Sequence, residues 1–162
     1  MTPSRTYRVE RVTLRVVREG GAACGPLRLN APEIAVRAIR DLGLLPDEAR
    51  ERMVVLLLDA QLGLIGVHEV SVGTLSASLV HPREVFRAAL LTPGTASMVL
   101  VHNHPSGDPT PSPEDLRLTR QLAEAGRLLD IRIHDHLIVG DGTDRYISIA
   151  ETRPETLSWP SE

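Results

Sequence analysis

Aromatic residues are almost absent from this chain, which has one Trp, one Phe and two Tyr among 162 residues. Proteins that bind single-stranded nucleic acid stack the bases on aromatic side chains, so this scarcity argues against a base-stacking surface. The formal net charge of -3 also argues against nucleic-acid binding, because binding to a phosphate backbone depends on clustered Lys and Arg side chains. The composition therefore argues against nucleic acid as a partner.

Cysteine is equally scarce, and Cys24 is the only one. A single cysteine can form neither an intrachain disulfide nor a thiolate zinc cluster, and its glycine-rich surroundings are typical of a loop thiol. The chain also lacks an apolar run of the roughly 20 residues that cross a bilayer, and its first residues lack the apolar core of a signal peptide. We therefore expect a cytoplasmic protein with no membrane partner.

Hydrophobic patterning predicts a single α/β domain. Short continuous apolar runs such as MVVLLLD are typical of buried strands, whereas apolar residues three and four apart are typical of amphipathic helices. The order of these patterns predicts a central mixed β-sheet flanked by helices. Helices are expected at 31–42, 81–91 and 112–129, and strands at 53–59, 64–74, 97–102, 131–140 and 145–150.

The regions outside this core carry weaker patterns. Residues 1–30 are expected to form an N-terminal extension, with an edge strand within residues 8–18. The catalytic domain would then span residues 31–150. Residues 151–162 contain two prolines and no apolar period, which predicts an extended tail.

Two histidines lie at the end of a predicted buried strand. In the segment VLVHNHPSGDPTPSPED, His102 and His104 are two residues apart, so both imidazoles point to one face if the strand continues through them. Pro105 favours this, because the residue before a proline is restricted to extended conformations. Gly107 and the prolines after it then reverse the chain. The sequence therefore predicts a chelating pair.

A helix start follows this pair. Ser112 is the expected N-cap, Pro113 lies in the first turn and Asp115 is three residues after the cap. Taken alone, Ser112 and Asp115 would be a capping pair that stabilises the helix by about 1 kcal/mol. Because the helix comes directly after the histidine strand, the carboxylate is expected in the same crevice. Two imidazoles and one carboxylate leave a fourth position open for water, which is typical of catalytic zinc sites.

The run HNHPSGDPTPSPED resembles the signature of the JAMM (MPN-plus, or JAB) metalloproteases, in which His-x-His-Pro is followed by Ser-x-x-Asp. The spacer, with Ser106, Gly107 and Pro111, is similar to that of the RadC branch. The resemblance extends over residues 31–150. It implies a JAB1/MPN architecture, which is cytidine-deaminase-like, and a zinc-dependent metallopeptidase or isopeptidase.

The resemblance also implies roles for particular residues. In the family, the two histidines and the aspartate bind Zn²⁺, and they correspond here to His102, His104 and Asp115. The serine of the signature assists the oxyanion, and it corresponds to Ser112.

The family requires, in addition, a glutamate at the start of a core strand that follows a helix. Glu51 directly precedes the buried run at 53–59 and follows the helix at 31–42, which matches this position. Glu69 is the alternative, although polar alternation around it indicates an edge or solvated position. The glutamate would take a proton from the zinc-bound water that attacks an amide carbonyl, and pass it to the leaving amine.

A second His-x-His pair, His134 and His136, is a weaker candidate for a metal site. No helix with a carboxylate at its start follows it, and in a regular strand Asp135 would point away from both histidines. The RadC branch resembles this chain in carrying an Asp-His pair here. Asp135 and His136 are therefore expected either to orient the site or to form a local hydrogen-bond network.

Two other functions compete with the enzyme. A DNA-repair role is suggested by the RadC name and by no residue of this chain, and the residues before Ala31 are too few for the helix-hairpin-helix segment usual in full-length relatives. A catalytically silent metal-binding scaffold would require that the glutamate expected to act as the base be misplaced relative to the metal ligands. For the enzyme, the substrate would be a peptide or protein. The sequence carries no motif for a ubiquitin-like partner and assigns no oligomeric state.

Overall fold

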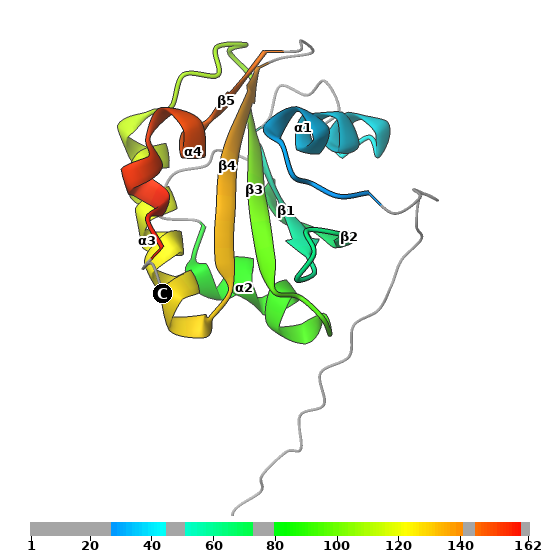
Figure 1. Cartoon of the computed structure of the whole chain (residues 1–162). Coiled ribbons are helices and arrows are strands. Elements are labelled where there is room, and N and C mark those ends of the chain that lie inside the picture. The colour runs from blue at the N-terminus through cyan, green and yellow to red at the C-terminus, as the bar shows by residue number, and fades with distance from the viewer. Residues whose placement is uncertain (1–26, 45–50, 73–79, 141–144, 160–162) are drawn as a thin grey trace, which may run out of the picture.

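A five-stranded mixed sheet forms the centre of the molecule, seen in a computed structural model that describes residues 27–44, 51–72, 80–140 and 145–159. The strand order is β2-β1-β3-β4-β5 (Figure 1). Strands β3 and β4 are parallel, and every other neighbouring pair is antiparallel. The strands are β1 Arg52–Leu58, β2 Leu64–Val72, β3 Ser97–His104, β4 Arg132–Gly140 and β5 Tyr146–Ser148.

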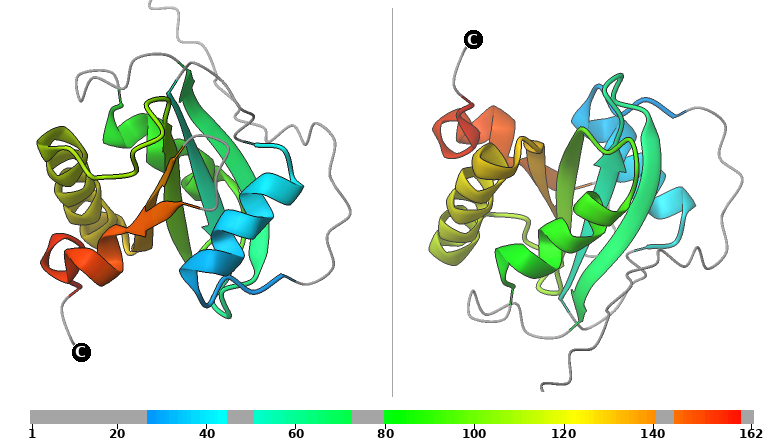
Figure 2. Two further views of the ribbon diagram at one scale, coloured as in Figure 1. Left: turned by 90° about the horizontal axis from the view of Figure 1, so that it is seen from above. Right: turned by 90° about the horizontal axis from the view of Figure 1, so that it is seen from below.

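Helices cover both faces of this sheet (Figure 1, Figure 2). Helix α1 packs on one face, and α2 and α3 pack on the other, so each face has its own hydrophobic cluster. This arrangement confirms the predicted α/β fold class. The helices are α1 Pro32–Asp41, α2 Pro82–Leu91, α3 Pro113–Leu129 and α4 Ile149–Thr152, followed by the 3₁₀ helix η1 Pro154–Leu157.

Strand β1 shows why a continuous apolar run lies at the centre of the sheet. Successive side chains of a strand point to opposite faces, so a strand covered on both sides needs apolar residues at every position. Six consecutive residues of β1 are buried. Met53, Val55 and Leu57 belong to the cluster with α2 and α3, whereas Val54, Leu56 and Leu58 belong to the cluster with α1.

Helix α3 connects the two parallel strands. Parallel neighbours need a crossover connection, so α3 starts close to the carboxyl end of β3, where the histidine pair lies. Its buried positions recur every three to four residues, which turns one face toward the sheet. These positions are Asp115, Leu118, Thr119, Leu122, Ala123 and Gly126.

The C-terminal segment corrects one prediction. Residues 151–162 were expected to be extended, but α4 continues to Thr152 and η1 follows it. Ser148 caps α4 by accepting a hydrogen bond from the backbone of Glu151, and Leu157 is buried in the cluster with α3. Elements of four residues are too short to show a hydrophobic period, so sequence patterning alone missed them.

The remaining elements agree with the predicted order, with shifted ends. The predicted strand at 145–150 ends at Ser148, where α4 begins, and β3 continues to His104, two residues beyond its predicted end. The expected edge strand within 8–18 and Cys24 lie outside the described residues. In the described ranges, no helix is long and apolar enough to cross a membrane.

The packing of α3 predicts different effects for two leucines of the same helix. Leu122 is fully buried, whereas Leu128 is 88% exposed. Leu122→Ala should lower the free energy of unfolding by about 2–5 kcal/mol, because it removes buried methyl groups and leaves a cavity. Leu128→Ala should change it by no more than about 0.5 kcal/mol. Urea denaturation of both variants measures the difference, and equal effects would contradict the described orientation of α3.

Candidate metal centre

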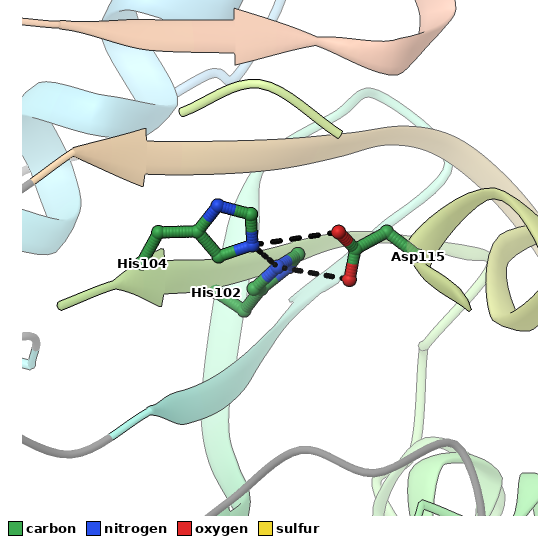
Figure 3. A group of neighbouring side chains, drawn as sticks. All are labelled: His102, His104 and Asp115. Carbon is green, nitrogen blue, oxygen red and sulfur yellow. Dashed lines mark hydrogen bonds and ion pairs between the residues drawn. The ribbon is translucent and has the colours of Figure 1, made fainter. Parts of the chain in front are cut away.

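Three side chains converge at the end of β3 (Figure 3). The Nε2 atoms of His102 and His104 are 3.0 Å apart. The carboxylate of Asp115 lies 3.3 Å from Nε2 of His102 through Oδ1, and 3.4 Å from Nε2 of His104 through Oδ2. Among the described residues, this is the one group of three or more His, Cys, Asp or Glu side chains arranged to hold a metal ion.

The extended backbone of β3 continues through both histidines. His102 pairs with Met53 of β1 and with Ile138 of β4, and His104 pairs with Gly140. Because the strand stays regular, the two imidazoles lie on one face, the face covered by α2 and α3. The predicted chelating geometry therefore exists in the fold.

A tight loop returns the chain from β3 to the start of α3. Gly107 has φ +78°, and its N–H donates to the carbonyl of His104 at 3.0 Å. The loop packs closely against β4, because a Cβ added at Gly140 would lie 2.6 Å from the carbonyl oxygen of Gly107. Glycine at these two positions lets the chain turn and pack tightly, which keeps the two parts of the site close together.

The start of α3 orients the third candidate ligand. Ser112 and Asp115 form a capping box, in which the hydroxyl of Ser112 accepts from the backbone N–H of Asp115 at 3.1 Å. The backbone N–H and the hydroxyl of Ser112 each donate to Oδ2 of Asp115 at 2.7 Å. The same hydrogen bonds thus cap the helix and hold the carboxylate of Asp115, the candidate metal ligand, in one orientation.

Electrostatics favour a positive charge between these groups. Burial acts to raise the pKa of Asp115, but hydrogen bonds from His102 and His104 outweigh it and hold this pKa far below its ordinary value. The hydrogen bond with Asp115 raises the pKa of His104, and the negative charge of Glu51 adds a smaller increase. Two imidazole nitrogens face each other beside an ionised carboxylate, which suits a proton or a metal cation between them.

The two candidate glutamates lie on opposite faces of the sheet. Glu51 comes two residues before Met53, the β1 partner of His102, so alternation places it on the histidine face. Glu69 pairs with Val54, whose side chain belongs to the cluster with α1 on the other face. Glu69 is also engaged in an ion pair with Arg52 at 2.9 Å. The fold thus brings Glu51, and not Glu69, to the face of the histidines.

The second histidine pair is split by a β-bulge. Met98 pairs with Ile133 and Val99 with Asp135, so His134 is the extra residue. Asp135 was expected to point away from both histidines, but His134 and Asp135 line the same cavity beside α1. Of the three residues, only His136 faces the candidate metal centre. A chelating pair at His134 and His136 is therefore absent from the described fold.

Asp135 and His136 have different surroundings. The carboxylate of Asp135 accepts hydrogen bonds from the hydroxyl of Ser148 at 2.6 Å, from the backbone of Ala150 at 2.9 Å and from the backbone of His136 at 2.7 Å. These contacts tie β4 to the start of α4. His136 is fully buried, and its Nε2 lies 2.8 Å from Nδ1 of His102.

Sequence reasoning missed Thr119. This residue is fully buried, and its Oγ1 lies 2.6 Å from Nδ1 of His136 and 2.6 Å from the carbonyl oxygen of Asp115. The sequence did contain a signal for it, because Thr119 follows Asp115 by four residues and therefore lies on the same face of the helix. A threonine on a helix face is common, however, and only the contact with β4 distinguishes this one.

The capping box predicts a stability effect at Ser112 that does not depend on metal. Ser112→Ala removes a hydroxyl that both caps α3 and holds the Asp115 carboxylate, so it should lower the free energy of unfolding by about 1 kcal/mol. Ser112→Thr keeps the hydroxyl and should retain most of the stability. Urea denaturation in the presence of a chelator measures both variants. Unchanged stability of Ser112→Ala would contradict a structural contribution of this cap.

A family model described as RadC-like JAB domain matches residues 29–154 of this chain. Similar proteins include the UPF0758 proteins of three organisms. The one from Syntrophomonas wolfei subsp. wolfei is 49% identical over 115 residues, which are 70% of this chain and 48% of the relative. The one from Methanosarcina acetivorans is 50% identical over 105 residues, 65% of this chain and 44% of the relative. The one from Moorella thermoacetica is 48% identical over 121 residues, 72% of this chain and 52% of the relative.

The matched region covers about half the length of each of these relatives. The family match at residues 29–154 includes the strand β3, the helix α3 and every residue of the candidate metal centre. The family match over most of the chain confirms the resemblance inferred from the His-x-His-Pro and Ser-x-x-Asp segments. This chain belongs to the RadC-like branch of the JAB/MPN superfamily.

Proposed function

We propose that this chain is a zinc-dependent hydrolase that cleaves amide bonds, either as a metallopeptidase or as an isopeptidase. The observation that carries the proposal is the convergence of three side chains. Nε2 of His102 lies 3.0 Å from Nε2 of His104 and 3.3 Å from Oδ1 of Asp115, and Nε2 of His104 lies 3.4 Å from Oδ2 of Asp115.

These separations are close to those between the ligand atoms of a tetrahedral zinc ion. With ligand atoms about 2.0–2.1 Å from the ion, the edges of a tetrahedron measure about 3.3–3.4 Å. Two neutral imidazoles and one carboxylate are ligands that Zn²⁺ accepts, and three protein ligands leave a fourth position for water. When bound, Zn²⁺ supplies Lewis acidity, which lowers the pKa of water to about 7 and polarises a carbonyl group.

Glu51 is the proposed general base. It directly precedes β1, and strand alternation puts it on the face and at the sheet end where His104 lies. Its negative charge contributes to the raised pKa of His104. A carboxylate in this position would take a proton from the attacking water and return it to the nitrogen of the leaving amine.

Ser112 is the proposed donor to the oxyanion. In the structure its hydroxyl donates to Oδ2 of Asp115, and its backbone N–H donates to the same oxygen. The hydroxyl could therefore turn toward a substrate oxygen while the backbone N–H continues to hold the carboxylate. One such donor contributes about 3 kcal/mol in other hydrolases.

Metal analysis tests the proposed ligand set. The purified chain should bind about one Zn²⁺, as expected for a site with three protein ligands, and His102→Ala should lose it. The matched control is His134→Ala, because His134 lies on the neighbouring strand and lines the cavity beside α1. An unchanged zinc content in His102→Ala, measured by mass spectrometry of the metal, would exclude this ligand set.

A pair of glutamate variants tests the catalytic proposal. Glu51→Gln should lower the rate of peptide or isopeptide cleavage by about 10²–10⁴-fold while zinc stays bound, because the amide cannot accept the proton. Glu69→Gln should leave the rate unchanged, since Glu69 lies on the other face of the sheet with Arg52. The reverse result would assign the base to Glu69.

The same preparation can test the competing functions. Salt-sensitive binding to duplex DNA, with no cleavage of any peptide or isopeptide, would favour the DNA-linked role. Zinc binding without cleavage and without DNA binding would favour a silent scaffold.

A further inference from the structure

A buried chain of hydrogen bonds runs from His102 back to the backbone of Asp115. Nδ1 of His102 lies 2.8 Å from Nε2 of His136, and Nδ1 of His136 lies 2.6 Å from Oγ1 of Thr119. Oγ1 of Thr119 in turn lies 2.6 Å from the carbonyl oxygen of Asp115. The side chains of Thr119 and His136 are fully buried and His102 is 1% exposed, so water does not compete for these contacts.

The chemistry of the last contact fixes the direction of the chain. A carbonyl oxygen only accepts, so the hydroxyl of Thr119 must donate its single proton to Asp115. The oxygen of Thr119 can then only accept from the ring of His136, which places a proton on Nδ1 of His136. This proton position determines which atom donates and which accepts in the remaining hydrogen bonds of the chain.

The remaining proton positions follow in the same way. His136 is fully buried, where a second ring proton would leave a charge without hydration, so the neutral ring with no proton on Nε2 is favoured. Nε2 of His136 therefore accepts from an N–H at Nδ1 of His102. Because Nδ1 of His102 donates to His136, Nε2 is the nitrogen left to bind a metal ion, on the side of His104 and Asp115.

We propose that His136, oriented by Thr119, is a positioning residue that fixes the tautomer and the ring orientation of His102, so that Nε2 is presented to the metal. This inference rests on the proposed function, since it concerns the same metal centre. The histidine ligands of metal sites usually donate their other ring N–H to a carboxylate, a carbonyl or water. Here the acceptor of that hydrogen bond is the ring of another histidine, His136.

The two histidine ligands are oriented by different contacts. Nδ1 of His104 lies 2.9 Å from the carbonyl oxygen of Asp108 in an exposed part of the loop. His102 instead depends on side chains of β4 and α3. Because this chain of contacts ends on the backbone of Asp115, it connects two of the three metal ligands through the interior of the protein.

Thr119 allows a test that changes little else. Thr119→Val keeps the shape of the side chain but removes the acceptor for His136 and the donor to Asp115, whereas Thr119→Ser keeps the hydroxyl. Zinc affinity, measured by competition with a chromogenic chelator, should fall about 10–100-fold in Thr119→Val, as for other residues that orient metal ligands. Thr119→Ser should retain the wild-type affinity, and so should the control His134→Ala.

A second measurement uses the metal-free chain. Two-bond ¹H–¹⁵N correlations of the histidine rings report which nitrogen carries the proton. In the wild type, His136 and His102 should both be protonated on Nδ1, and in Thr119→Val this pattern should be lost for His136. A merely structural role of Thr119 would lower stability but leave the ring protonation unchanged.

The outcomes separate this inference from the proposed function. Equal zinc affinity and unchanged tautomers in Thr119→Val would overturn the positioning role, while zinc binding by the wild type would still support the metal centre. Zinc binding by neither protein, together with the expected tautomers in the wild type, would overturn the zinc hydrolase and leave the hydrogen-bond chain supported.

Discussion

The parallel pairing of β3 with β4 is the constraint on which the rest of the site depends. Parallel neighbours cannot be joined by a tight turn, so the chain crosses over through α3, which starts beside the carboxyl end of β3. His102 and His104 lie at that end, and Asp115 in the first turn of α3 therefore meets them. Antiparallel pairing of β1 with the other side of β3 brings Glu51 to the same end of the sheet.

Several contacts in this region contribute to stability and to the site at once. The capping box of Ser112 and Asp115 stabilises the start of α3 and also directs the carboxylate toward the histidines. Thr119 satisfies a carbonyl of its own helix and contacts His136 on β4. A polar group buried at such a position needs a partner, so these polar contacts between α3 and the sheet also restrict the side chains of the candidate ligands.

Sequence patterns were least informative where the structure departs from regular periods. The bulge at His134 places two consecutive side chains, His134 and Asp135, along one cavity, whereas strict alternation places them on opposite faces. The segment after Ser148 lacks an apolar period, but Ile149 and Leu157 are both buried in the cluster with α2 and α3. Both features arise from contacts between elements distant in sequence, which no local pattern records.

The sequence by itself determined the candidate ligands, because their geometry is local. Alternation along β3 places His102 and His104 on one face, and cap spacing places Asp115 in the first turn of the next helix. Only the tertiary structure decided that Glu51 shares their face and that Thr119 and His136 lie behind His102. These relations depend on strand register, on the bulge and on the packing of α3 against β4, which are set by contacts across the whole sheet.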